Sequence, residues 1–450
     1  MTNNLKLTNS LTRKKELFKP INLKNISMYA CGPTVYDVPH VGNARTLIVF
    51  DILFRVLKIT YGENVKYVRN ITDVDDKIIN ISKKKNLPIK EITRDVINVF
   101  HKNCINLNCL KPTVEPRATE HIIDMIEMIT SLINKNFAYE IKGHIFFSVS
   151  SFKGYGKLSN KNLEELKSGV RIEESNLKKN QMDFVLWKPS QNEDPGWVSP
   201  WGRGRPGWHL ECSVMSEKYL GKIFDIHGGG LDLIFPHHEN EIAQSCCNNS
   251  TNNLANYWVH NGFVTINKEK MSKSLGNIIT ISEAVKKYSG QVVRLSLLSA
   301  HYSQPLDWND ELLMNQNKII DKWYNLYAEP NGDDASTISQ TLFDDLNTPG
   351  FIAKIHELYN EALKGDGKSK NLFNIACRLI GLFDLDKTQW NNFKKSKHKI
   401  SEETIIEKIN ERIKARKNED FKLADEIRDE LLNNGIVIED KKGKTNWKYK

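Results

Sequence analysis

The chain has 450 residues, of which 40% are hydrophobic and 26% are charged, a balance that predicts a folded protein of about two to four domains and excludes a collagen-like or low-complexity chain. No apolar run reaches the ~18 residues that a membrane span needs, and the N-terminus lacks the apolar core of a secretory signal, so we expect a cytoplasmic protein without a membrane segment. The seven cysteines are too few for a disulfide scaffold, and the net charge of +9 is compatible with a nucleic-acid partner, although a Lys-, Asn- and Ile-rich composition can produce it without one.

The first 110 residues alternate between strand-like and helical patterns. Residues 26–31 form an apolar run that predicts a buried strand ending at a Gly-Pro turn, and residues 43–59 carry apolar side chains at helical spacing. A second strand is expected at residues 65–68. Strand, helix and strand in this order make a βαβ unit, which predicts an α/β fold with a parallel sheet.

The pattern changes from about residue 113, where helical stretches and turn-rich segments read as an inserted module. The α/β pattern resumes at residues 222–227, a predicted strand that runs into three glycines. Ligands of open α/β sheets lie beyond the carboxyl ends of the strands. Cys31 and His227 both stand at such ends, so the sequence predicts that they share one site.

The last third of the chain is predominantly helical. Residues 311–390 show helical patterns, residues 391–400 are lysine-rich without acids and predict a linker, and residues 413–432 predict a single helix closed by Gly435. The basic tail carries Trp447. This aromatic residue could stack on unpaired bases of an RNA or pack on its own domain, and the sequence leaves both possibilities open.

Two nucleotide-binding motifs can be excluded. Residues 202–207 read literally as GxGxxG, but a Ser-Pro-Trp segment precedes them and a proline lies inside the turn, whereas a dinucleotide fingerprint needs a strand before it and a helix after it. The chain also lacks the GxxxxGK[ST] pattern. The sequence therefore predicts neither a dinucleotide-binding loop of this kind nor a P-loop.

Two other segments predict a polyphosphate site. Residues 39–43 follow the first strand and open a helix, where free N–H groups, His40 and the small Gly42 suit a phosphate. Residues 270–277 place Lys270 and Lys273 among hydroxyl side chains in a loop. Lysines in such a loop can stabilise the charge that develops on a leaving pyrophosphate, so the two segments together indicate a site for the phosphates of ATP.

A metal site is predicted from spacing and donor chemistry. His237 and Glu241 are four residues apart and share a helix face, but the HExxH pattern of zinc proteases fails because Ile242 stands where its second histidine would be. Cys31 and Cys212 are the best candidates for the remaining ligands of a zinc ion. The cysteines expected to be buried apolar side chains are Cys104, Cys109, Cys246, Cys247 and Cys377, and the histidines expected to line the site without an assigned role are His209, His227, His238 and His260.

Together these motifs resemble those of cysteinyl-tRNA synthetases, a family of class I aminoacyl-tRNA synthetases. The segments that carry the resemblance are residues 28–37, 40–43, 70–73, 207–212, 227–241, 270–274, 344–349 and 425–429. They extend over nearly the whole chain. One departure is Asn43, which stands where the class signature often has a second histidine; because an asparagine amide can still donate to phosphate, we expect activity to be retained.

The resemblance implies a Rossmann-like catalytic domain split by an insertion, followed by an α-helical bundle and a small C-terminal anticodon-binding domain. We assign residues 1–112 and 206–310 to the two halves of the catalytic domain, 113–205 to the insertion, 311–392 to the helical bundle and 393–450 to the anticodon-binding domain. It further implies a monomer that ligates L-cysteine to tRNA(Cys) through a cysteinyl-adenylate, with ATP as substrate, Mg²⁺, and one zinc ion per chain.

The site residues that follow fall into three groups. The ATP-binding group is His40, Gly42, Asn43, His227, Gly229, Lys270 and Lys273, of which His40 and Lys273 are expected to be catalytic; the cysteine-binding group is Gly32, Thr72 and Trp208; and the zinc ligands are Cys31, Cys212, His237 and Glu241. Two rival functions remain open. One is a mycothiol-type cysteine ligase, which shares the catalytic motifs but attaches cysteine to an amino sugar, and the other is a non-catalytic RNA-binding paralogue.

Overall fold

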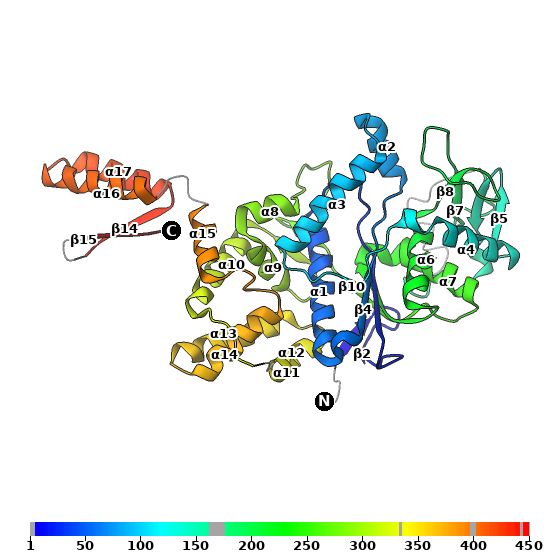
Figure 1. Ribbon diagram of the computed structural model, residues 1–450, viewed down its shortest axis with the longest axis horizontal. Coiled ribbons are helices and arrows are strands. Elements are labelled where there is room, and N and C mark those ends of the chain that lie inside the picture. The colour runs from blue at the N-terminus through cyan, green and yellow to red at the C-terminus, as the bar shows by residue number, and fades with distance from the viewer. Residues whose placement is uncertain (1–4, 162–175, 333–334, 397–401, 442–443, 450) are drawn as a thin grey trace. The chain divides into compact units, whose positions relative to one another are not determined.

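The computed structural model describes residues 5–161, 176–332, 335–396, 402–441 and 444–449, and the chain divides into two compact units, Met1–Leu382 and Phe383–Lys450 (Figure 1). The helices of the first unit are α1 (Val41–Tyr61), α2 (Asp76–Lys85), α3 (Ile89–Asn106), α4 (Ile122–Asn134), α6 (Trp208–Leu220), α7 (Glu239–Asn249), α8 (Ile281–Tyr288), α9 (Gly290–Leu298), α10 (Asp310–Trp323), α11 (Ala335–Ile338), α12 (Gln340–Phe343), α13 (Thr348–Leu363) and α14 (Gly367–Leu379). Across the described residues, every helix is too short or too polar to cross a membrane.

A four-stranded parallel sheet forms the centre of the first unit. Its strands lie in the order β10 (Ala255–Asn261), β9 (Phe224–Gly230), β3 (Ile26–Ala30) and β4 (Val65–Arg69). The chain leaves β3 toward β4 on one side and returns to β9 on the other, so the strand order reverses at β3 and β9. The crevice beyond the carboxyl ends of these two strands is where open α/β sheets bind their ligands.

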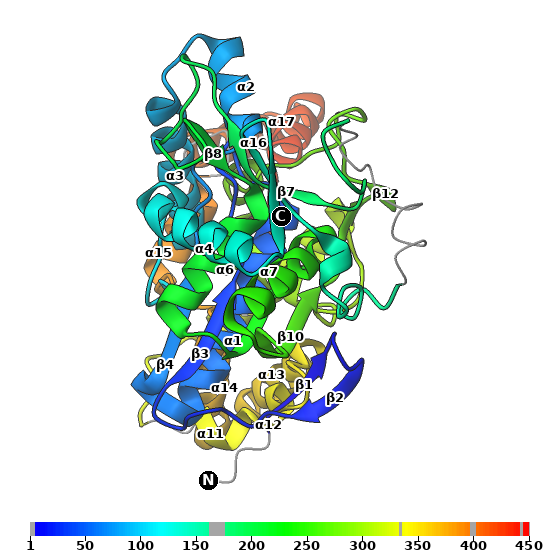
Figure 2. The ribbon, with the colours of Figure 1, turned by 90° about the vertical axis from the view of Figure 1, so that its right-hand side faces the viewer.

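Helices cover both faces of this sheet, which explains why its strands are continuous apolar runs. On one face, Tyr67 of β4 packs against Phe54 of α1, with ring centroids 5.3 Å apart. On the other face, the neighbouring residue Val68 joins a core cluster with Leu210 and Met215 of α6 (Figure 2). The expected βαβ unit and the α/β class with a parallel sheet are confirmed.

The inserted module contains a second sheet that the sequence did not reveal. Four short antiparallel strands lie in the order β5 (Ala138–Ile141), β6 (His144–Phe147), β7 (Phe184–Pro189) and β8 (Gly204–Pro206). Strands of three to six residues, separated by long turn-rich stretches, give too little alternation to be recognised from sequence. Gly207 follows β8 directly and precedes α6, so the last strand of the module is connected to the helix that lies beside the crevice.

A small third sheet carries the lysine-rich loop. It consists of β12 (Glu269–Lys270), β11 (Val264–Ile266) and β13 (Leu306–Trp308). The loop after β12 is joined to the start of α1, because the N–H of Val41 donates to the carbonyl of Ile279 at 3.0 Å. An N-terminal hairpin, β1 (Lys6–Asn9) and β2 (Lys14–Leu17), completes the strands of the first unit.

The second unit contains α15 (Lys387–Lys395), α16 (Glu402–Lys417), α17 (Phe421–Asn433) and the hairpin β14 (Ile436–Lys441) and β15 (Lys444–Tyr449). The single helix expected over residues 413–432 is wrong. The chain breaks at Glu419, whose φ is +61°, and Asp420 caps α17 by accepting from the N–H of Leu423 at 3.1 Å. The linker expected at 391–400 is also wrong over its first half, which lies in α15, while residues 397–401 lie outside the described residues.

Trp447 settles one of the alternatives that the sequence left open. It pairs with Ile438 across the β14–β15 hairpin and packs against the core formed by α16, α17 and β14. The partly buried indole therefore packs on its own domain.

Candidate active site

Four predicted metal ligands meet at the carboxyl end of β3. Cys31 directly follows β3, Cys212 lies on α6, His237 lies in the single wide turn Ile234–His238, and Glu241 lies in the first turn of α7. One ligand atom from each of them lies within 4.8 Å of the other three. We call these four residues the metal-ligand set.

The distances within the metal-ligand set are short. The Cys31 Sγ lies 3.7 Å from the Cys212 Sγ and 3.5 Å from the His237 Nε2, and the His237 Nε2 lies 3.0 Å from the Glu241 Oε1. Cys212, His237 and Glu241 are buried, and Cys31 is partly buried. Two sulfurs, one imidazole nitrogen and one carboxylate oxygen converging from four separate segments form a donor set that fits zinc.

Without an ion, electrostatics favour charge on Cys212, His237 and Glu241 but not on Cys31, where burial and the neighbouring Cys212 raise the pKa of the thiol well above its usual value. Burial would raise the pKa of Cys212, but the hydrogen bond from Cys31 and the neighbouring His237 lower it to about 6. Burial would lower the pKa of His237, but Glu241 raises it to about 10. Glu241 has a pKa well below its usual value because His227 and His237 outweigh its burial. A metal binds the deprotonated forms of cysteine and glutamate and the neutral form of histidine, so an ion bound here would displace protons from Cys31 and His237.

Four further histidines, His209, His227, His238 and His260, surround this set. The His227 Nε2 lies 2.7 Å from Oε2 of Glu241, and the His209 Nδ1 lies 3.0 Å from the Nδ1 of His237. The His238 Nε2 lies 3.3 Å from Cys31, and its Nδ1 lies 2.8 Å from His260. These contacts fix the orientation of the ligands, as second partners of metal ligands do. His227, expected in the ATP group, is fully buried and stacked on Trp258. With Cys31, His238 and Glu241 it forms a second group whose ligand atoms lie within 4.8 Å of one another.

The predicted phosphate-binding segment begins α1. His40 is the N-cap of this helix: its Nδ1 accepts from the Asn43 N–H at 3.4 Å, and the Asn43 Oδ1 accepts from the His40 N–H at 3.0 Å. Burial lowers the pKa of His40, so the imidazole is neutral near pH 7. Because its Nδ1 accepts from Asn43, its proton lies on Nε2. A Cβ on Gly42 would lie 3.0 Å from the His40 ring and 3.3 Å from the Met271 side chain, so this helix start approaches the lysine loop closely.

Lys273 is held beside this segment. Its Nζ lies 2.5 Å from Oδ2 of Asp37 and 5.3 Å from the centre of the Tyr36 ring. The ion pair raises the pKa of Lys273, and it lowers that of Asp37 despite the partial burial of the carboxylate. Lys270 is exposed at the end of β12, where its carbonyl accepts from Asn277. The two segments that predicted a polyphosphate site are therefore neighbours.

The three residues expected to bind cysteine border the metal-ligand set. The Gly32 N–H donates to the Asn70 Oδ1 at 2.9 Å, and a Cβ on Gly32 would lie 1.7 Å from the Asn70 carbonyl, so only glycine fits. Thr72 donates to the buried Glu211 at 2.7 Å. The Trp208 ring stacks on His237 with centroids 4.2 Å apart and 23° between the planes.

Gly229 is also closely packed, although less tightly than Gly32. A Cβ there would lie 2.8 Å from Leu233 and 3.1 Å from His238, so the glycine run lets β9 pass close to the histidines. Glu211 was missed from sequence. Burial raises its pKa well above the usual value, and a lone glutamate in a helix carries no pattern that distinguishes it from a solvated one.

The comparisons with known proteins agree with this geometry. Residues 17–318 match the family model for the tRNA synthetases class I (C) catalytic domain, and residues 409–447 match that for the cysteinyl-tRNA ligase anticodon binding domain. The cysteine–tRNA ligase of Pelagibacter ubique is 56% identical over 453 residues, which cover 100% of both chains. That of Rickettsia prowazekii is 49% identical over 97% of both chains.

Among solved structures, Mycobacterium tuberculosis methionyl-tRNA synthetase in complex with methionyl-adenylate is similar in fold. Its TM-score is 0.55 at 16% identity, covering 79% of this chain and 81% of that one. This likeness concerns the fold alone, whereas the family models and the full-length relatives concern the sequence. The chain belongs to the cysteinyl-tRNA synthetase family of class I aminoacyl-tRNA synthetases.

Proposed function

We propose that this chain is an ATP-dependent cysteine–tRNA ligase that joins L-cysteine to tRNA(Cys) through a cysteinyl-adenylate. The observation that carries the proposal is the pair of cysteine sulfurs at the end of β3, beside an imidazole and a carboxylate. The connection from β3 to α1 also carries His40, so the amino-acid site and the phosphate site share one segment.

The donor set accounts for selection of cysteine against serine. The two amino acids differ in one atom, and a small difference in shape gives only ~1–3 kcal/mol of discrimination. Where binding alone must give ~10⁴–10⁵-fold selectivity, about 5.5–7 kcal/mol is needed. A zinc ion held by the metal-ligand set would bind the substrate thiolate, for which a serine hydroxyl is a far poorer replacement. No separate editing site is then required.

Adenylate formation uses the segment at α1 and the lysine loop. The cysteine carboxylate attacks the α-phosphate of ATP, and pyrophosphate leaves. The N-terminus of α1 faces the phosphates with its N–H groups, and the Nε2–H of His40 donates to a phosphate oxygen. Lys273 leaves Asp37 and neutralises the charge on the departing pyrophosphate, and the amide of Asn43 supplies a further donor.

Transfer to tRNA needs no covalent enzyme intermediate. The 3′-terminal hydroxyl of the tRNA attacks the activated carbonyl and loses its proton, and AMP leaves as the ester forms. The chain contributes by holding the two substrates in place. Trp208 and Thr72 line the amino-acid site, and Gly32 leaves room beside Asn70. We further infer one zinc ion per chain, Mg²⁺ bound with ATP, and a monomer that works in the cytoplasm.

The test is pyrophosphate exchange that depends on both cysteine and ATP, followed by charging of tRNA(Cys). We expect exchange without tRNA, charging when tRNA is added, and neither reaction with serine. An amino-sugar ligase would show the exchange but would not charge tRNA. An RNA-binding paralogue would show neither reaction, and either result would overturn the proposal.

A further inference from the structure

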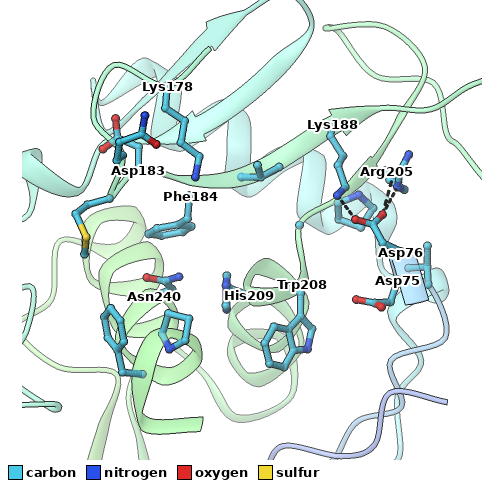
Figure 3. Close-up of a pocket in the computed structure, with 18 of the residues that line it drawn as sticks. Asp75, Asp76, Lys178, Asp183, Phe184, Lys188, Arg205, Trp208, His209 and Asn240 are labelled. Atoms are coloured by element: carbon cyan, nitrogen blue, oxygen red, sulfur yellow. Dashed lines mark hydrogen bonds and ion pairs between the residues drawn. The ribbon is translucent and has the colours of Figure 1, made fainter. Parts of the chain in front are cut away.

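A pocket of about 270 Å³ lies between the inserted sheet and the metal-ligand set (Figure 3). Phe184 of β7 and Arg205 of β8 line it from the insertion, and Trp208 and His209 line it from the start of α6. Its volume is just below the ~300 Å³ at which small-molecule sites begin, which suits one planar group rather than a whole nucleotide. Of the residues given a role above, Trp208 and His209 line this pocket, and the rest of its lining has no assigned role.

The pocket and the amino-acid site share a wall. Trp208 lines the pocket, is 37% exposed, and stacks on His237 of the metal-ligand set. His209 also lines the pocket, and its Nδ1 lies 3.0 Å from His237. A group bound in the pocket would therefore lie one side chain away from the amino acid that is transferred.

The charges around the pocket argue against a phosphate. Lys188 and Arg205 form ion pairs with the same carboxylate, Asp76, the second at 2.9 Å. Over the whole lining, the three acids Asp75, Asp76 and Asp183 balance the three bases Lys178, Lys188 and Arg205, so the pocket has no excess of positive charge. Asp183 accepts from the Val149 N–H at 2.9 Å and from the Tyr139 hydroxyl at 2.7 Å, within the insertion. Phosphate recognition relies on cations that are not compensated by carboxylates, so a neutral polar ring fits this pocket better.

One carboxylate oxygen is available as an acceptor. Oδ1 of Asp75 caps α2 by accepting from the Lys77 N–H at 2.7 Å. For its Oδ2, the described part of the chain supplies no hydrogen-bond donor. Figure 3 shows the Asp75 carboxylate directed toward Trp208. A carboxylate in this position accepts from the exocyclic amino group of a cytosine or an adenine.

Building on the proposed function, we propose that this pocket receives the base of one unpaired nucleotide at the 3′ end of the tRNA, with its exocyclic amino group donating to Oδ2 of Asp75. Single-stranded RNA is recognised by splaying bases into pockets with aromatic walls, which Phe184 and Trp208 supply here. The three nucleotides that end every tRNA, C-C-A, all carry such an amino group. The phosphates of that nucleotide stay outside the pocket.

Two substitutions separate this contact from the cap of α2. Asp75→Ser and Asp75→Asn both keep a good N-cap, but serine offers no second oxygen and asparagine cannot present two acceptors. Asp124→Asn, which changes a partly buried carboxylate of α4 paired with Lys218 outside the pocket, is the matched control. The assay measures pyrophosphate exchange without tRNA and, separately, single-turnover transfer from preformed cysteinyl-adenylate to tRNA.

We expect both Asp75 variants to keep the wild-type exchange rate and melting temperature, but to slow transfer at subsaturating tRNA by at least about 5-fold. A tRNA lacking the amino group at one of its last three bases should slow the wild-type enzyme similarly and should not slow Asp75→Ser further. The inference would be overturned if the Asp75 variants transferred cysteine at the wild-type rate or lost pyrophosphate exchange as much as transfer. It would also be overturned if removing the amino group slowed Asp75→Ser as much as the wild-type enzyme at each of the last three bases. Failure of the wild-type enzyme to charge unmodified tRNA would instead overturn the proposed function, and this inference with it.

Discussion

Replacing Lys273 by alanine should slow adenylate formation about 10²–10³-fold, because removing one preorganised donor to a developing charge has an effect of this size. The ground state should change little. Lys273 and Asp37 are 64% and 44% exposed at their side chains, and an ion pair this exposed contributes at most about 1 kcal/mol. Binding of ATP should therefore change by no more than about 5-fold, and the melting temperature should stay the same.

Rapid-quench measurement of pyrophosphate release, combined with cysteine binding followed by the fluorescence of Trp208, separates these effects. The rate should fall while the Kd for cysteine stays within about 2-fold, since the contacts of Lys273 are with Asp37 and Tyr36. Lys287→Ala, an equally exposed lysine paired with Asp310, is the matched control and should change neither quantity. Equal losses in the rate and in cysteine binding would refute the role assigned to Lys273.

Two further substitutions test how α1 is held in place. Asp51→Asn should lower the free energy of unfolding by about 3–5 kcal/mol because it leaves the buried Arg294 without its carboxylate partner. Burial raises the pKa of Asp51, but Arg294 outweighs burial and brings this pKa below 3.8. Denaturation should therefore show a loss of stability that is constant near pH 7 and shrinks as the pH falls below about 4, where the wild-type carboxylate becomes protonated. Arg45→Met should remove the donors to four backbone carbonyls in the segments that lead into β11 and β13. We expect a lower melting temperature and a KM for ATP that rises more than the KM for cysteine. Arg45→Lys should partly restore both the melting temperature and the KM for ATP. A constant deficit down to pH 3 in the first case, or equal changes of both KM values in the second, would contradict these roles.

The central sheet could be predicted because each of its elements is specified locally. The apolar run at residues 26–31, the helical spacing that follows and the glycines that end β9 are local signals for the strand, the helix and the end of the next strand. The metal-ligand set could be proposed because His237 and Glu241 stand four residues apart, Cys31 follows a strand end, and thiolates are the donors that zinc prefers. The sequence alone could not show that Cys31 and Cys212 lie side by side, because their proximity depends on the fold, which packs α6 against β3.

The remaining features depend on contacts that sequence spacing does not encode. Glu211, which accepts from Thr72, lies in a segment distant from Thr72 in the sequence. The same is true of several histidine partners of the metal-ligand set, and each of these residues alone resembles an ordinary polar residue. The break between α16 and α17 depends on the positive φ of Glu419, a residue without a turn signature. Domain boundaries for the five predicted segments stay a prediction; the structure separates only Met1–Leu382 from Phe383–Lys450.

The central claim is that Cys31, Cys212, His237 and Glu241 hold one zinc ion that recognises the sulfur of the substrate. Zinc-edge X-ray absorption on the purified full-length protein, with and without L-cysteine, tests it most directly. We predict one zinc per chain with two sulfur neighbours at about 2.3 Å, and three sulfur neighbours after cysteine is added but not after serine. Protein that binds no stoichiometric zinc, or a sulfur count that cysteine leaves unchanged, would contradict the account.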